Sequence, residues 1–151
     1  MGIQQHGSLQ FFIGEFFQAK SQEFRIKQFV EVRLRLNAVT GRHVVPDVMV
    51  VERPYIKGRI VVDVPAVVIE VKSPEDRFDE IIDKCFEYAA AGIANIIMID
   101  PDSRRQAVFA GNALQFVEPL IRLHLPRANV DLVLPVDEIF ARLDADEKDD
   151  E

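Results

Sequence analysis

The sequence has a single cysteine, Cys85, and no tryptophan among its 151 residues. One cysteine excludes an internal disulfide, which is compatible with a reducing cytoplasmic compartment. No apolar run approaches the roughly 18 residues of a membrane span, and no charged-then-apolar leader precedes a cleavage site. We therefore expect a cytoplasmic protein that does not associate with membranes.

Several catalytic and binding motifs are also absent. The sequence has no glycine-rich phosphate loop, no G-x-S-x-G elbow and no internal repeat. Its three histidines, His6, His43 and His124, have no metal-ligand spacing, which argues against a zinc site. These absences leave the acidic residues as the main candidates for chemistry.

The chain lacks the basic excess of a dedicated nucleic-acid-binding protein. Its net charge is −7, and the segment 144–151 contributes −5 of this through six acids and one lysine. That segment is predicted to be a disordered acidic tail. Residues 1–143 are predicted to form one domain with a net charge of only −2.

Apolar periodicity predicts alternating helices and strands. Helical spacing favours helices at 7–20, 77–91 and 135–143. Alternation and continuous apolar runs favour a hairpin of strands 29–36 and 44–51, central strands at 66–71 and 95–100, an edge hairpin at 107–117 and a short strand at 131–134. A helix between two central strands implies a right-handed, parallel crossover, so the predicted fold class is α/β with a central mixed β-sheet flanked by helices.

Two of these elements have a predicted buried face. In strand 29–36, the inward residues are expected to be Val30, Val32, Leu34 and Leu36. In helix 77–91, the inner face is expected to comprise Ile81, Ile82, Cys85, Phe86 and Ala89. Gly92 is placed to end this helix as its C′ residue.

Three charged residues, Asp47, Glu70 and Lys72, stand in segments that are otherwise apolar. Buried charge is costly unless it is paired or holds a metal. Glu70 and Lys72, two residues apart, lie on the same face of a strand about 7 Å from each other. If the strand that follows Pro46 pairs beside strand 66–71, Asp47 and Glu70 can converge on one hard cation. Pro46 favours a strand start or a bulge, which suits a positioned Asp47. The pattern therefore predicts a site for divalent-metal phosphate chemistry.

Two further side chains are candidates for this site. Lys84 lies at the margin of the inner face of helix 77–91, where it can pair with Glu80 at i,i+4 or overhang the site as a second cation. Glu15 falls outside the apolar stripe of helix 7–20, so it is either a solvated residue or a third metal contact.

The charged pattern resembles a known motif: V-P-D at 45–47 and E-V-K at 70–72 are similar to the PD-(D/E)XK nuclease superfamily. Longer runs resemble the Uma-type family of restriction-endonuclease-like bacterial proteins, over His6 to about Leu143. These runs are P-D-V-M-V-V, P-A-V-V-I-E-V-K-S-P-E-D, D-K-C-F-E-Y-A-A-A-G-I and I-I-M-I-D-P.

This resemblance implies a restriction-endonuclease-like fold and a Mg²⁺-dependent phosphodiesterase that acts on DNA, with Mn²⁺ as a substitute metal. It implies that Asp47 and Glu70 are metal ligands, with the Val71 carbonyl as a further ligand. Lys72 corresponds to the cation near the attacking water, and Lys84 matches a lysine typical of the family's helix.

The chain departs from the family pattern at two places. Many members carry an apolar residue at the position of Lys72 and rely on the helix lysine, whereas this chain has both lysines, which leaves their division of labour open. The chain also begins near the family's histidine-led helix, without the preceding segment and its glutamate. Glu15 and Glu31 are then the candidates for a third carboxylate.

Three alternatives remain open from the sequence. A nuclease-fold protein that no longer cleaves could serve as a nucleic-acid-binding or oligomeric interaction module. Asp47 and Glu70 could be the paired carboxylates of a glycosidase, although this explains neither Lys72 nor the lack of tryptophan platforms. The same charges could form a structural ion pair with Lys72. A homodimer is also expected, because two copies are needed to cut both strands of a duplex and the edge hairpin offers a pairing surface.

Overall fold

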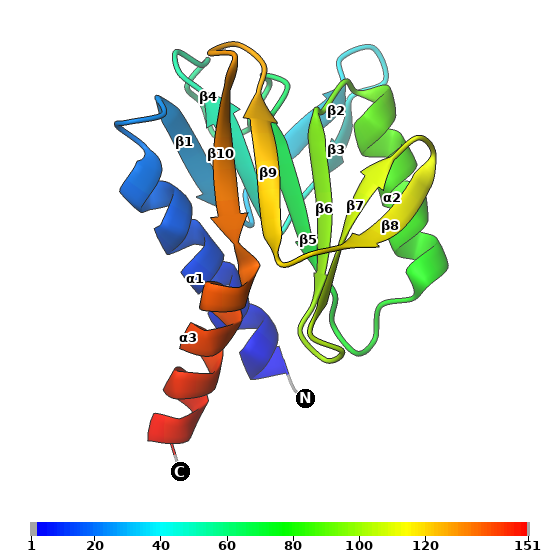
Figure 1. Cartoon of the computed structure of the whole chain (residues 1–151). Coiled ribbons are helices and arrows are strands. Elements are labelled where there is room, and N and C mark those ends of the chain that lie inside the picture. Colours follow the sequence, from blue (N-terminus) through cyan, green and yellow to red (C-terminus); the bar gives the residue numbers. More distant parts are fainter. Residues whose placement is uncertain (1–2, 151) are drawn as a thin grey trace.

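The computed structural model describes residues 3–150 and contains a six-stranded mixed β-sheet covered on both faces (Figure 1). The helices are α1 (Ile3–Lys20), α2 (Phe78–Ala90) and α3 (Val136–Asp149). The strands are β1 (Ile26–Val30), β2 (Leu34–Asn37), β3 (Arg42–Val44), β4 (Val48–Glu52), β5 (Val67–Val71), β6 (Asn95–Asp100), β7 (Arg105–Ala110), β8 (Ala113–Val117), β9 (Leu120–Leu125) and β10 (Val130–Pro135). Within this range, no helix combines the length and apolar composition needed to cross a membrane.

The sheet has the strand order β1-β4-β5-β6-β7-β8. Strands β5 and β6 are parallel, and all other neighbours in this sheet are antiparallel. The parallel pair is joined through α2, as the strand-helix-strand pattern predicts. Gly92 follows this helix with φ of 89°, a left-handed conformation that favours glycine, so the predicted helix end is confirmed. The predicted α/β class with a mixed sheet is therefore confirmed.

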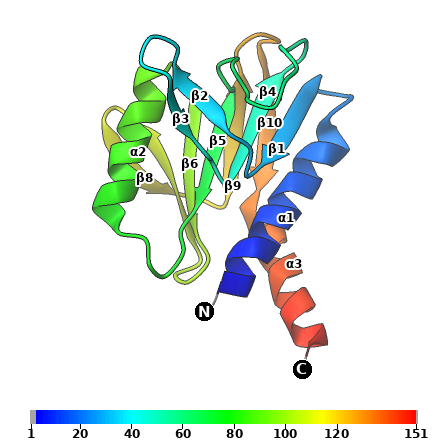
Figure 2. The same ribbon diagram turned by 180° about the vertical axis from the view of Figure 1, so that it is seen from behind.

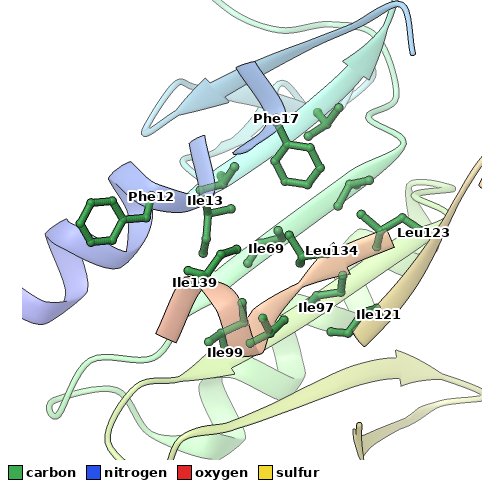
Figure 3. Close-up of a cluster of buried hydrophobic side chains, with 14 of the residues drawn as sticks. Phe12, Ile13, Phe17, Ile69, Ile97, Ile99, Ile121, Leu123, Leu134 and Ile139 are labelled. Atoms are coloured by element: carbon green, nitrogen blue, oxygen red, sulfur yellow. The ribbon is translucent and has the colours of Figure 1, made fainter. Parts of the chain in front are cut away.

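Each face of the sheet has its own apolar cover. Helices α1 and α3 and the β9–β10 hairpin lie on one face, whereas α2 and the β2–β3 hairpin lie on the other, as Figures 1 and 2 show. Figure 3 shows the apolar cluster on the first of these faces, where α1, α3, β9 and β10 pack on the isoleucines of β5 and β6. Strand β5 is buried along its whole length, as the sequence predicts for a central strand.

The long N-terminal hairpin is interrupted, which corrects the predicted strand 29–36. Strand β1 pairs with β4 and β2 pairs with β3, and the two ladders are separated at Glu31 and at Pro46–Asp47. Glu31 has φ of 54°, which no regular strand adopts. The interruption turns Val30 outward, and its side chain is 39% exposed. Asp47 consequently stands at a break in the hairpin, directly before β4.

The inner face of α2 also differs from its prediction. The residues that face the sheet are Ile81, Cys85 and Tyr88, which follow one another at i, i+4 and i+7. Phe86 is 44% exposed and packs edge-on against Phe109 at the margin of the helix. Ala89 is exposed as well. The helix is therefore rotated about its axis relative to the prediction, and this rotation brings Tyr88 against the sheet.

The C-terminal part contains more regular structure than predicted. Strand β9 was not predicted, although its residues alternate between exposed and buried. The acidic segment 144–151, predicted to be disordered, continues α3 as far as Asp149. No proline or glycine interrupts residues 136–149, and Asp144 forms an ion pair with Arg104.

Candidate active site

The register of the sheet brings Asp47 and Glu70 together. Strands β4 and β5 are antiparallel with Val48 opposite Ile69, so the next pair in that register is Asp47 opposite Glu70. Each carboxyl group shifts the pKa of the other, as expected for two neighbouring acids. The structure therefore places the two acids side by side, at the C-terminal end of the central strand β5.

Asp47 is held by both the sheet and α1. The Gln10 amide donates a hydrogen bond to Oδ1 at 2.9 Å, and the Val71 N–H donates one to Oδ2 at 2.7 Å. The His6 imidazole Nε2 lies 3.5 Å from the same Oδ2. Burial raises the pKa of Asp47, but the hydrogen bonds from His6 and Val71 and the charge of His6 outweigh it, so the pKa lies below its ordinary value. Asp47 is consequently ionised at neutral pH.

The same contacts act on His6 in the opposite sense. The hydrogen bond with Asp47 raises the pKa of His6, burial lowers it, and the charges of Asp47 and Asp76 and a contact with the Val71 backbone raise it further. The net pKa is raised. A raised histidine pKa means that this part of the site stabilises positive charge.

Glu70 is in a different electrostatic state. Its side chain is almost fully buried, and its Oε1 accepts a hydrogen bond from the Tyr88 hydroxyl at 2.5 Å. Burial and the charge of Asp47 raise the pKa of Glu70 to about 7, against the opposing effects of Lys84 and Tyr88. Near pH 7 the acid pair therefore retains a proton for much of the time, at a position where a cation could neutralise both carboxylates.

The two lysines have different surroundings. Lys84 Nζ lies 3.8 Å from Glu70 Oε1, so Lys84 overhangs the acid pair as the second of its two sequence interpretations requires. Lys72 Nζ instead lies 3.4 Å from the Ser73 carbonyl and 5.5 Å from the centre of the Phe78 ring. Among the described residues, Lys72 forms no ion pair with Asp47 or Glu70, so the structural ion pair considered from the sequence is not formed.

The two candidates for a third carboxylate, Glu15 and Glu31, lie in different places. Glu15 forms an ion pair with Arg142 of α3 at 2.5 Å and has no contact with Asp47. Glu31 is connected to Asp47 indirectly, because the Gln10 amide donates to Glu31 Oε1 at 3.2 Å and to Asp47 at 2.9 Å. Glu31 thus lies beside the site, whereas Glu15 does not.

Three residues at the site were missed from the sequence: His6, Gln10 and Tyr88. His6 and Gln10 are four residues apart on α1, so they lie on one face of the helix, and this spacing was the available signal. Tyr88 follows Lys84 by four residues on α2, so the two side chains also share a face. Each of the three contacts Asp47 or Glu70 directly.

The oxygen atoms at this point fit a hard divalent cation. Across residues 3–150, no three His, Cys, Asp or Glu side chains form a ready-made metal cluster. The available donors are the carboxylates of Asp47 and Glu70 and the Val71 carbonyl. Mg²⁺ suits such a set, because it binds oxygen, retains several waters and takes only one or two carboxylates from a protein. A small pocket next to Glu70 is lined by the charged residues Asp76, Glu80 and Lys84 together with the apolar Val71 and Ile81.

The site and the sheet together define the class of the protein. The structure has an acid directly before β4, an acid-x-lysine triplet at the end of β5 and a helix that follows it. This arrangement is that of a restriction-endonuclease-like fold of the PD-(D/E)XK type. The chain belongs to the Uma2 family, described as "Putative restriction endonuclease", whose family model matches residues 1–137. The family predicted from the sequence is thus confirmed, and membership supports a nuclease-like function.

A solved structure has a similar fold. The crystal structure of a "putative nuclease belonging to DUF820" from Anabaena variabilis ATCC 29413 matches with a TM-score of 0.74 and 19% sequence identity. The match covers 92% of this chain and 82% of that chain. The cryo-EM structure of a DrdV–DNA complex matches with a TM-score of 0.43 and 16% identity, over 89% of this chain and 10% of that chain, which is too weak to support an argument. Curated proteins gave no match.

Proposed function

We propose that this protein is a Mg²⁺-dependent endonuclease that hydrolyses phosphodiester bonds in DNA. The observation that carries the proposal is the pair of adjacent acids, Asp47 and Glu70, one of which is almost fully buried with a raised pKa. A strongly perturbed acid beside a second acid is typical of a functional site. Family membership and the similar nuclease fold support the same class of activity.

In this proposal, Asp47, Glu70 and the Val71 carbonyl hold the metal ion. When bound, Mg²⁺ polarises a phosphoryl oxygen and acidifies water, which is the chemistry that the side chains here cannot supply. Gln10 and the Val71 N–H keep Asp47 oriented, because each donates to one of its two oxygens. Tyr88 restrains Glu70 in the same way.

The two lysines supply positive charge at different points. Lys84 offsets the charge of Glu70 and favours its ionised form. Lys72 orients the attacking water and stabilises the negative charge that develops on the phosphate. To do so its side chain has to leave the Ser73 carbonyl and the Phe78 ring. Both contacts are weak, since the hydrogen bond is long and a partly exposed cation–π contact contributes about 0.5–1 kcal/mol.

The proposed assembly is a homodimer, because one copy of this site can cut only one strand of a duplex. Strands β1 and β8 are the two edges of the central sheet, and an edge strand offers unpaired backbone groups for association. Strand β8, with Phe116 and Val117 partly exposed, is the edge predicted from the sequence.

A second candidate function is a nuclease-fold module that binds nucleic acid or a second copy without cutting. The observation that favours it is the position of Lys72, whose amine contacts the Ser73 carbonyl rather than the acid pair. Residues 1–143 also lack a basic excess. In this case Asp47 and Glu70 would have no catalytic role.

The deciding experiment is cleavage of supercoiled plasmid and of single-stranded DNA with Mg²⁺, with Mn²⁺ and with a chelator. Wild type is compared with Glu70→Gln, and Glu15→Gln serves as a matched control because Glu15 lies outside the acid pair. Metal-dependent cutting by wild type and Glu15→Gln, lost in Glu70→Gln, supports the endonuclease. Absence of cutting by wild type with either metal favours the non-catalytic module, and equal cutting by Glu70→Gln reveals a contaminating nuclease.

A further inference from the structure

The first two turns of α1 contact both oxygens of Asp47. Gln10 donates to Oδ1, and His6 lies against Oδ2, and these two residues are one helical turn apart. Gln10 is only 5% exposed, so its amide is a fixed, buried donor. The His6 ring also contacts the backbone of Val71. His6 therefore lies beside Asp47 and Val71, which are two of the three groups assigned to the metal.

We propose that His6 supplies a nitrogen ligand to the same metal ion that Asp47 and Glu70 hold. This inference rests on the proposed function. The separation of 3.5 Å between His6 Nε2 and Asp47 Oδ2 is at the outer limit of a hydrogen bond, so the metal-free contact is weak. Two ligands about 2.1 Å from one cation lie about 3 Å apart at a right angle and about 4 Å apart when opposite each other, so this separation fits a shared cation.

Gln10 acts on this arrangement as a positioning residue. Its hydrogen bond occupies Oδ1 and therefore directs Oδ2 toward His6 and the end of β5. Partners that orient a metal ligand typically change metal affinity by about 10–100-fold when they are removed. The helix thus provides one group that binds the ion and one that orients a neighbouring ligand.

A nitrogen ligand changes which ions the site prefers. Carboxylates and carbonyls suit both Mg²⁺ and Mn²⁺, whereas an imidazole nitrogen suits transition ions and is not a ligand that Mg²⁺ favours. With His6 as a ligand, the site binds Mn²⁺ more tightly than Mg²⁺. Removal of His6 should weaken Mn²⁺ binding by about tenfold or more and should affect Mg²⁺ less.

The test is the electron spin echo spectrum of bound Mn²⁺, in which a coordinated imidazole nitrogen produces a characteristic modulation. The proteins to compare are wild type, His6→Ala, Glu70→Gln and the double variant His43→Ala/His124→Ala. His43 and the His124 side chain are exposed, so the double variant retains His6 as the only histidine. Titration with Mn²⁺ and with Mg²⁺ gives the affinities of the same proteins.

Nitrogen modulation in wild type and in the double variant, lost in His6→Ala, supports the inference. Mn²⁺ binding that depends on Glu70 but shows no nitrogen modulation overturns it and leaves the proposed function intact. Absence of Mn²⁺ binding by wild type overturns both. If His6→Ala does not fold, the double variant still decides, because His6 is then the only imidazole that can give the signal.

Discussion

Two buried glutamates on neighbouring strands have very different hydrogen-bonding partners. Glu52 ends β4 and is 8% exposed, and Glu70 lies in β5 and is 6% exposed. The oxygens of Glu52 each accept a backbone N–H at 2.9 Å, from Arg127 and Ala128 in the β9–β10 turn. Glu70 receives one hydroxyl and a distant ammonium, and it faces a second carboxylate.

The difference separates a carboxylate that the fold satisfies fully from the one that we propose as a metal ligand. A buried charge is tolerated when hydrogen bonds to the charged form replace the lost water, and two backbone N–H groups do this for Glu52. Glu70 lacks comparable compensation, and its pKa rises to about 7 as a result. Burial of a carboxylate alone therefore does not indicate a candidate functional site, whereas burial without compensating hydrogen bonds does.

The largest expected effect comes from replacing each glutamate by glutamine. Glu70→Gln should lower the cleavage rate by about a thousandfold, because one metal ligand is lost, while the metal-free protein at pH 8 is at least as stable as wild type. Glu52→Gln should do the reverse, with cleavage within about threefold of wild type and about 2 kcal/mol lost from the free energy of unfolding. Plasmid cleavage and urea denaturation measure the two quantities. Equal effects of the two variants on both quantities would remove the distinction.

The lysines extend this comparison, because Glu70 has a lysine partner and Glu52 has none among the described ion pairs. Lys84→Met should lower the cleavage rate by about a hundredfold, since Lys84 favours the ionised form of Glu70. Lys72→Met should also lower the rate, through loss of water orientation. Both are measured on plasmid at saturating Mg²⁺, with Lys57→Met as an exposed control. Wild-type cleavage by Lys72→Met would exclude Lys72 from the chemistry.

The pH dependence of stability should show the raised pKa of Glu70. Its pKa in the folded protein, about 7, lies above the ordinary 4.5, so the folded state binds the proton more tightly than the unfolded chain. Stability of the metal-free protein should therefore fall as pH rises from about 4.5 to 7, by about 3 kcal/mol, and this dependence should disappear in Glu70→Gln. The pKa of His6 is also raised, so His6 should add a further loss of stability as the pH rises above 6.5. Urea denaturation in chelator measures this, and an unchanged slope in Glu70→Gln would contradict it.

The smallest effect expected is that of Tyr88→Phe. The Tyr88 hydroxyl donates to Glu70, so its removal should raise the pKa of Glu70 further and leave less carboxylate at pH 7. Cleavage should fall by about tenfold at pH 7 and recover at higher pH. Tyr55→Phe is the matched control, because Tyr55 packs edge-on against Phe29 away from the acid pair. A uniform loss across the pH range would indicate a structural effect instead.

The central part of the fold could be predicted from sequence because it depends on local pattern. Continuous apolar runs identified β5 and β6, and strand alternation placed Glu70 on the face opposite Val71. Once the hairpin was assumed to lie beside β5, Asp47 had to fall near Glu70. The pairing of the two acids thus follows from register once β4 is taken to pair with β5, and that strand pairing is seen only in the structure.

The parts that could not be predicted depend on how elements cross in space. His6 and Gln10 reach Asp47 only because α1 lies across the sheet with its first turns at the end of β5. The interruption at Glu31 arises from a backbone conformation that alternation does not encode. Strand β9 is a different case, since Leu120–Leu125 alternates and the signal was present in the sequence.

The position of Glu70 in β5 also has a consequence for amide hydrogen exchange. Strand β5 is hydrogen-bonded to β4 on one side and β6 on the other, so its amides should be among the slowest to exchange. His6 and Gln10 come from the first turns of α1, where the leading N–H groups have no partner within the helix and local opening is easy. An ion that connects these two regions would protect α1 far more than β5. The start of α1 would then be the part of the protein that metal binding orders most.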